Sequence, residues 1–223
     1  MAAVKKTIEQ STKQPSQQPS PKEPSRGYFK LWWEIITEPV SFYEKIPTSL
    51  GYRQPTIFAL KTSAFILAIL FIIIGFMALM FAAMKVASSS SAPFTGVAGV
   101  VFLILLIAYP LLLLFSWGML YVWSGIIHLF AQLLGAKQGF KETFVSVCYS
   151  TAPQLVLFIP LVGSAAGIYS YVLQGIGLHK RQKMTPGKAA AAIIIPVGIL
   201  MIVVIGLYVV YFLYLFSAMR ING

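Results

Sequence analysis

The sequence predicts an all-α protein, a polytopic transmembrane bundle of about five helices with short interfacial helices before the first span. Of its 223 residues, 58% are hydrophobic and 10% are charged, whereas soluble domains carry about 25% charged residues. Several apolar runs are long enough to cross a bilayer, which takes about 20 residues. The 17 Lys and Arg outnumber the 6 Asp and Glu and gather between those runs. This is typical of the cytoplasmic segments of membrane proteins, so the net charge does not indicate a nucleic-acid partner.

The segment before the first apolar run divides into two parts. Residues 1–26 are rich in Ser, Gln, Pro and Lys, and so few apolar residues predict a disordered, basic cytoplasmic tail. Residues 27–61 mix aromatic and charged residues, which predicts an amphipathic segment in the headgroup region with Trp32 and Trp33 at the interface. Pro39 is expected to end a first short helix, and a second is expected at about 41–46.

Residues 62–216 form the predicted transmembrane domain. The first run has no charged residue and contains twelve Leu, Ile or Phe. The second run is long enough for one overlong helix or two, but three aromatic residues at the opposite interface favour one helix, kinked at Pro110. The third and fourth passes form a short hairpin that either spans or re-enters. The predicted spans are about 62–84, 97–120 with an extension to 134, 143–161, 163–179 and 189–216; the aromatic residues of the second are Trp117, Tyr121 and Trp123.

The distribution of positive charge predicts the topology. With five passes and a cytoplasmic N-terminus, residues 1–61, 135–142 and 180–188 face the cytoplasm and contain 15 of the 17 Lys and Arg. If the second apolar run formed two helices, only 10 of the Lys and Arg would face the cytoplasm. The positive-inside rule therefore favours five passes, with the C-terminus outside. A re-entrant third and fourth pass gives the same count. Residues Lys180, Arg181, Lys183 and Lys188 of the last loop are expected to contact anionic lipid headgroups.

The third and fourth passes carry most of the polar residues within the spans. Ser146, Ser150 and Gln154 are spaced by four and are expected to share one helix face, which Pro153 interrupts next to Tyr149. The fourth pass contributes a matching stripe of small and polar residues: Gly163, Gly167, Ser170 and Gln174. Such a face either packs helices together or binds a lipid or small polar solute at a broken helix.

The sequence contains no spacing that indicates catalysis. All six acidic residues lie outside the predicted spans, and no nucleophile, base and carboxylate are grouped. Cys148 is the only cysteine and there are two histidines, too few and too far apart for a metal site. We therefore expect no enzyme activity, no metal site and no cofactor.

Three segments, taken together, resemble the Ypt-interacting-protein (YIP) family of polytopic membrane proteins. The resemblance implies five passes and a cytoplasmic N-terminus, with a prokaryotic-type member in the cell (inner) membrane. Eukaryotic members act in trafficking with Rab-type GTPases, but their Asp-Leu-Tyr-Gly-Pro motif is absent here, so GTPase binding is not carried over. The segments are Ile36-Thr37-Glu38-Pro39-Val40-Ser41-Phe42, Cys148-Tyr149-Ser150-Thr151-Ala152-Pro153 with Ile159-Pro160, and Gly177-Leu178-His179 through Thr185-Pro186-Gly187-Lys188-Ala189.

Two functional hypotheses follow. The first is a non-enzymatic protein that organises the membrane or scaffolds partners in it, with the lipid bilayer as the main partner and other membrane proteins in a homo- or hetero-oligomer. The alternative is a transporter or permease subunit that uses the polar hairpin of the third and fourth passes.

Overall fold

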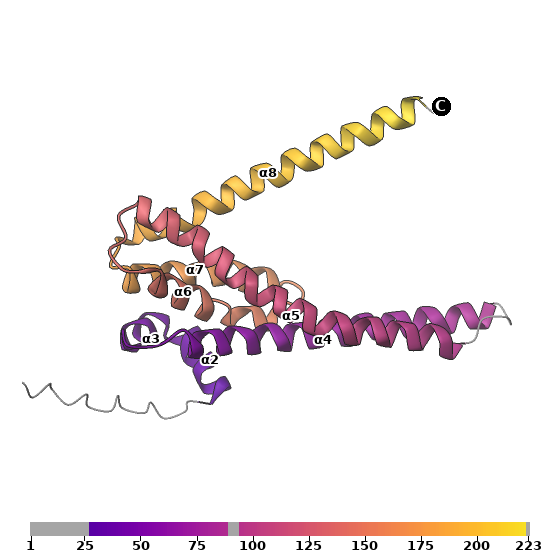
Figure 1. Cartoon of the computed structure of the whole chain (residues 1–223), viewed down its shortest axis with the longest axis horizontal. Coiled ribbons are helices and arrows are strands. Elements are labelled where there is room, and N and C mark those ends of the chain that lie inside the picture. The colour runs from indigo at the N-terminus through magenta and orange to yellow at the C-terminus, as the bar shows by residue number, and fades with distance from the viewer. Residues whose placement is uncertain (1–26, 89–93, 222–223) are drawn as a thin grey trace, which may run out of the picture.

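The computed structural model describes residues 27–88 and 94–221, and these are arranged as helices without strands (Figure 1). The tail predicted for residues 1–26 lies outside the described residues. In chain order the helices are α2 (Tyr28–Thr37), α3 (Pro39–Lys45), α4 (Arg53–Ser88), α5 (Phe94–Leu133), α6 (Phe140–Tyr149), the 3-10 helix η1 (Ala152–Val156), α7 (Val162–Arg181) and α8 (Pro186–Ile221). The predicted all-α class is confirmed.

Three of the described helices are long and apolar enough to cross a membrane, over Arg53–Phe81, Gly99–Leu133 and Pro186–Ser217. They correspond to the first, second and fifth predicted passes. The second run is one helix of 40 residues, and Pro110 lies inside it. Membrane helices tolerate a proline where neighbouring groups satisfy the carbonyl that it frees. The remaining two predicted passes correspond to α6, η1 and α7, which do not meet this criterion of length and composition. Five spans are therefore not confirmed.

The helix boundaries follow local sequence signals. Pro39 opens α3 directly after α2 ends at Thr37, as expected from the restriction that proline places on its predecessor. Pro186 opens α8, where a missing backbone N–H costs nothing. The Thr185 carbonyl accepts the Ala189 N–H at 3.0 Å, which makes the first turn of that helix.

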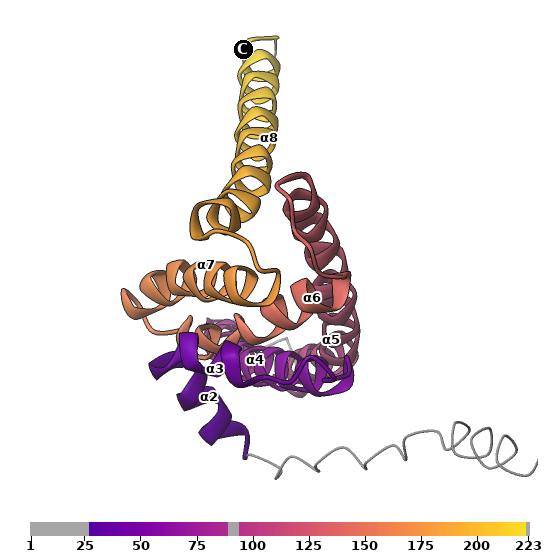
Figure 2. The same cartoon turned by 90° about the vertical axis from the view of Figure 1, so that its left-hand side faces the viewer.

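The helices spread from one common end (Figures 1 and 2). That end contains α2 and α3, the α5–α6 connection and the α7–α8 connection, whereas α4 with α5 and the C-terminal part of α8 diverge away from it. Of the segments that charge counting placed on one side of the membrane, the described residues 27–61 and the residues 135–142 and 180–188 lie at the same end of the molecule. From Ile199 to Phe216, α8 is exposed on every face, so this part of α8 has no packing partner among the described residues.

The main core lies at the common end, where α2 and α3 pack on the hairpin of α6, η1 and α7. Phe42 and Tyr43 of α3 are buried, and the ring of Phe42 meets that of Tyr149 edge to face at 5.0 Å. Tyr149 also stacks with Phe58 of α4. Each aromatic pair adds about 0.5–1.5 kcal/mol beyond the area that it buries. The segment before the first span is therefore part of the folded body.

Candidate functional site

A break in the third predicted pass shapes the centre of the molecule. The α6 helix ends at Tyr149, and η1 begins at Ala152 with Pro153 in its first turn. Pro153 has no N–H to donate and its ring clashes with the preceding turn, so an α-helix cannot continue through it. The hydroxyls of Ser150 and Thr151 donate to the carbonyls of residues 147 and 148 at 2.8 and 2.7 Å. The Ser150 bond satisfies a carbonyl that the break leaves without a helical partner, and the Thr151 bond joins the Thr151 N–H, which already donates to the carbonyl of residue 148 at 3.4 Å.

The hairpin of α6, η1 and α7 runs along only part of α4 and α5 (Figure 1). Its tip residue Leu157 borders the same cavity as Leu67 of α4 and Leu112 of α5. Beyond Leu67 the candidate span of α4 continues to Phe81, about 14 residues or about 21 Å of helix. The tip contains only apolar residues, all of them exposed: Leu157, Phe158, Ile159, Pro160, Leu161 and Val162.

A cavity of about 620 Å³ lies between this hairpin and the paired helices α4 and α5. This volume falls within the range typical of ligand pockets. Residues of α4, α5, α6, η1 and α7 line it, and most of the wall is apolar. The polar residues of its lining are Ser63, Ser116, Ser150, Thr151, Gln154, Ser170, Tyr171 and Gln174.

The structure divides the predicted polar face between two environments. Ser150, Gln154, Gly167, Ser170 and Gln174 line the cavity together. Ser146, Tyr149 and Pro153 instead lie buried in the protein core, and Gly163 lies at the hairpin tip. The expected single face of Ser146, Ser150 and Gln154 is not formed, because the break after Tyr149 changes the helical register between Ser146 and the other two.

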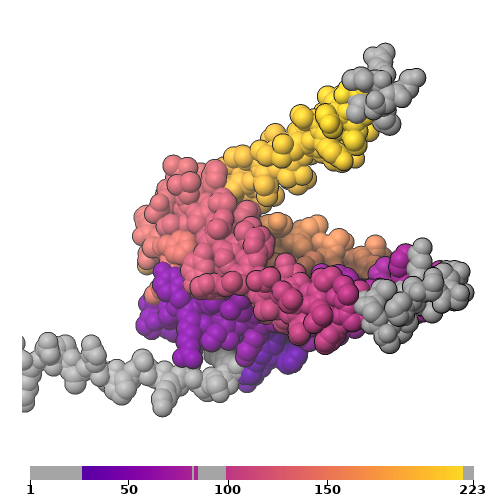
Figure 3. All heavy atoms as spheres, turned by 45° about the vertical axis from the view of Figure 1, so that its right-hand side comes forward, coloured from indigo at the N-terminus to yellow at the C-terminus, as the bar shows by residue number. Residues whose placement is uncertain are grey.

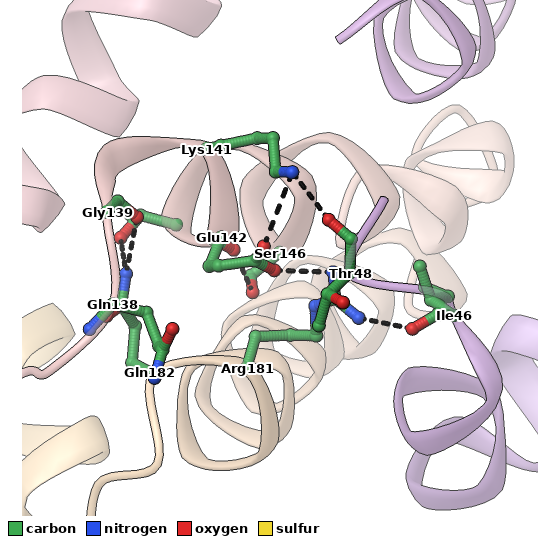
Figure 4. Close-up of polar contacts among 10 residues, drawn as sticks. Ile46, Thr48, Gln138, Gly139, Lys141, Glu142, Ser146, Arg181 and Gln182 are labelled. Carbon is green, nitrogen blue, oxygen red and sulfur yellow. Dashed lines mark hydrogen bonds and ion pairs between the residues drawn. The ribbon is translucent and has the colours of Figure 1, made fainter. Parts of the chain in front are cut away.

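The sequence analysis missed a buried ion pair at the open end of the hairpin. Glu142 of α6 and Arg181 of α7 are 7% and 6% exposed, and Arg181 Nη2 contacts Glu142 Oε2. Arg181 Nη1 also donates to the Ile46 carbonyl after α3 at 2.5 Å, so one guanidinium joins three elements (Figure 4). The positions of Glu142 and Arg181 at the two ends of the hairpin are the signal, because closing the hairpin brings its ends together.

Further polar contacts hold the same end closed (Figure 4). The buried Gln182 side chain accepts the Gln138 N–H at 3.0 Å and donates to the Gly139 carbonyl at 3.1 Å. Lys141 Nζ donates to the Thr48 carbonyl at 2.6 Å. These bonds fix the α5–α6 connection against the α7–α8 connection and against the segment that follows α3.

The structure corrects part of the expectation for the basic loop. Arg181 is paired with Glu142 and is not available to lipid headgroups. Lys180 Nζ donates to Glu44 Oε1 at 2.6 Å, and this hydrogen bond, with the charge of Lys180, holds the pKa of Glu44 below its ordinary value. Lys183 and Lys188 are exposed, so headgroup contact remains a prediction for these two.

The predicted interfacial aromatic residues are exposed to different degrees. Trp33 is 62% exposed, whereas the indole of Trp32 donates to the Ala152 carbonyl of η1 at 2.8 Å. Trp117 is 42% exposed. Tyr121 stacks on Phe144 of α6 with ring centroids 4.6 Å apart, and Trp123 packs partly against the core formed with α8. Trp33 and Trp117 therefore present the most surface to lipid.

The described residues contain no group of three or more His, Cys, Asp and Glu side chains close enough to hold a metal ion. Cys148 is fully buried and packs with Ala59 and Phe144. Both histidines are hydrogen-bonded within the protein, His128 to Thr143 and His179 to the Met184 carbonyl. The polar groups that remain for binding a ligand are those that line the cavity.

Long apolar helices around a small polar interior define the class of protein, a helical multi-pass membrane protein. The profile of the Yip1 domain matches residues 33–208, which is most of the chain, and the protein belongs to this family. The matched region covers α3 to α7 completely, with the second half of α2 and most of α8. No curated protein and no solved structure is similar enough to the chain to match it.

Proposed function

We propose that this Yip1 domain protein is a non-enzymatic organiser of the bilayer that adds cross-section mainly to one leaflet. The observation that carries the proposal is the hairpin of α6, η1 and α7, which starts at the common end and stops part of the way along α4 and α5 (Figure 1). With α4, α5 and α8 as spans, the hairpin re-enters from the side where α2 and α3 lie. The three long helices and both arms of the hairpin then occupy the leaflet at this end, and the opposite leaflet contains only the three long helices.

The exposed apolar hairpin tip supports this placement. Leu161 at the tip is 88% exposed, and the tip has no polar side chain to face water. A tip of this kind is stable in hydrocarbon, provided that its backbone is hydrogen-bonded. The Gly163 N–H donates to the Ile159 carbonyl at 2.7 Å and the Val162 N–H to the Pro160 carbonyl at 2.8 Å, which is consistent with a tip held at mid-depth.

Together, the hairpin and α2 form a unit at the common end that we call the wedge. The attachment of α2 to the hairpin and to α4 supports the proposal that this wedge is rigid. Tyr169 of α7 donates to the Ile36 carbonyl at 2.7 Å, and the hydroxyls of Tyr28 and Thr62 are 2.8 Å apart. With α2 held in this way, Phe29 and Trp33 remain exposed, at 68% and 62%. Aromatic side chains in this position favour the headgroup region, so the wedge extends into the membrane interface.

Removing both exposed aromatic side chains of α2 is expected to reduce the effect on bilayer shape. In the full chain, Phe29→Ala with Trp33→Ala removes about 3 kcal/mol or more of apolar interfacial burial. Reconstituted wild-type protein is expected to convert large liposomes into smaller or tubular vesicles, and the double variant to do so much less. Vesicle diameter measured by electron cryo-microscopy at equal protein-to-lipid ratio reports the difference.

The matched control is Phe212→Ala with Tyr208→Ala in the exposed part of α8, which removes a similar area from a spanning helix and leaves the wedge intact. This control is expected to shape vesicles as the wild type does. Vesicles that remain unchanged by wild-type protein, or an equal loss in both double variants, would contradict the wedge proposal.

The charges assign the orientation within this proposal. The common end contains the described basic residues of 27–61, 135–142 and 180–188, so it is proposed to face the cytoplasm of a prokaryotic cell, with the C-terminus on the other side of the inner membrane. Protease accessibility of a tag on each terminus, in sealed vesicles, tests the assignment.

A scaffolding role also needs partners, and the unpartnered face of α8 from Ile199 to Phe216 is a surface for another membrane protein or a second copy. Crosslinking in the native membrane followed by mild purification identifies such partners.

The cavity supports a second candidate function, a transporter or permease subunit. Its polar wall at the broken helix has the character of a solute site at membrane depth. Cys148 cannot report on it, because this residue is buried away from the cavity lining. A Gln154→Cys variant in a Cys148→Ala background tests the function directly, since a water-borne thiol reagent reaches residue 154 only along an aqueous path.

A further inference from the structure

One side chain in the cavity has a polar group without a partner. Gln174 of α7 is 2% exposed, it lines the cavity, and its Nε2 is buried without a hydrogen-bond partner among the described residues. Native proteins rarely leave a buried amide unpaired, because the lost hydrogen bond to water is not replaced. A polar group of a bound molecule would supply the hydrogen bond that Gln174 lacks.

The neighbouring hydroxyls indicate what kind of polar group fits. Ser150 and Thr151 use their hydrogens on carbonyls of α6, and Ser170 Oγ donates to the Ala166 carbonyl at 3.0 Å. Their oxygens retain lone pairs, because a hydroxyl has one donor and two acceptor positions. Beside Gln174, the cavity thus offers a donor together with several acceptors. A ligand hydroxyl matches both, since it accepts from the amide and donates to a Ser or Thr oxygen.

The absence of charge from the lining favours an uncharged ligand. No Asp, Glu, Lys, Arg or His is among the lining residues. A phosphate or carboxylate in this position would lose its hydration without gaining a countercharge, which is strongly unfavourable. The walls formed by Ile66, Leu67 and Leu112 are apolar, so the remainder of the ligand is expected to be apolar as well.

The rim of the cavity faces the bilayer. Phe115 and Met119 of α5 and Tyr171 of α7 line it and are 64%, 46% and 46% exposed. The space-filling view shows a hollow between α5 and α8 with α7 at its base (Figure 3). No residue of α8 lines the cavity, so its rim on α5 and α7 is open to the side, and in a bilayer a lipid molecule would reach it without crossing water.

From these observations we infer that the cavity binds the hydroxyl end of an uncharged lipid alcohol, of the class of diacylglycerols and polyprenols, which enters sideways past α5 and α7. The ligand hydroxyl pairs with Gln174, and its chains leave along the apolar rim. The site shares the hairpin with the proposed function, but its test measures labelling by a ligand and not vesicle shape, so failure of one is distinguishable from failure of the other.

The test uses the full chain in nanodiscs of phosphatidylcholine with a radioactive diacylglycerol that carries a photoreactive group near its glycerol end. Labelling is expected to be saturable and to map to peptides of η1 and α7. Unlabelled diacylglycerol is expected to compete. Phosphatidic acid with the same chains and free glycerol are expected not to compete, and these two arms separate a lipid hydroxyl from a phosphate and from a soluble polyol. Competition by either one, or labelling that maps to the exposed face of α8, would overturn the proposal.

Two variants sharpen the test. Gln174→Leu removes the amide at similar volume and is expected to lower labelling by about fivefold, the usual effect of losing one hydrogen bond. Met119→Trp narrows the exposed rim without disturbing buried packing, and it is expected to lower labelling even if Gln174→Leu does not fold. The control is Val172→Leu on the lipid-facing side of α7, which should label as the wild type does. Unchanged labelling in a folded Gln174→Leu protein, or in Met119→Trp, would contradict the site.

Discussion

Replacing Gly163 with Ala is expected to lower the free energy of unfolding by about 1–3 kcal/mol or more, the range for overpacking a dense site. A Cβ at this position would lie 2.2 Å from the Leu157 carbonyl oxygen and 2.9 Å from its carbon. Both are backbone atoms, so no change of rotamer relieves the clash and the hairpin tip itself must move. Thermal unfolding of the purified protein in detergent measures the loss.

Gly167, one turn further along α7, provides the matched control. A Cβ there meets only Leu157 Cδ2, at 4.0 Å, which is ordinary van der Waals contact. Gly167→Ala is therefore expected to be neutral, or to stabilise α7 by up to about 1 kcal/mol through helix propensity. A Gly163→Ala protein that unfolds at the wild-type temperature would show that the tip is not packed as described.

Removing the buried guanidinium is expected to have a still larger effect. Arg181→Met leaves the buried Glu142 with only the longer contact to Lys141, at 3.9 Å; losing the close partner of a buried pair typically costs about 3–5 kcal/mol, and the variant also removes the donor to the Ile46 carbonyl. The expected result is a protein with a much lower unfolding temperature and a large aggregated fraction in size-exclusion chromatography. Lys180→Met is the neighbouring control, because its ion pair with Glu44 is exposed to solvent and exposed pairs contribute little to stability.

A double variant separates the ion pair from simple packing. Glu142→Leu combined with Arg181→Met leaves no unpaired charge, and buried pairs replaced in this way are often neutral in stability. We expect the double variant to recover most of the loss of Arg181→Met. If the losses of Glu142→Leu and Arg181→Met add without coupling, Glu142 and Arg181 do not act as a pair.

The long helices were predictable because their signal is local. An uncharged run such as residues 62–84 specifies a membrane helix by composition alone, and Pro39 and Pro186 specify helix ends by their own chemistry. The hairpin was less predictable because its signal depends on neighbours. Residues 143–161 are apolar enough to suggest a pass, yet Pro153 and the bonds of Ser150 and Thr151 divide them into α6 and η1.

The candidate site was predictable only as a set of residue types. The spacing of Ser150 and Gln154, and of Ser170 and Gln174, identified polar positions in the hairpin. It did not reveal that Ser63 and Ser116 of distant helices complete the lining, or that Ser146 turns into the core. Those outcomes depend on how α4 and α5 pack against the hairpin, which no local pattern encodes.

The sequence by itself determined that this protein is helical and that it belongs in a membrane, and it predicts that the basic segments lie on one side, because hydropathy and charge act residue by residue on transfer into lipid. Only the tertiary structure decided how far the hairpin extends, that Glu142 meets Arg181, and that Gln174 faces a cavity without a partner. These features arise between segments far apart in the chain, where the closing of the hairpin, and no single residue, places the groups together.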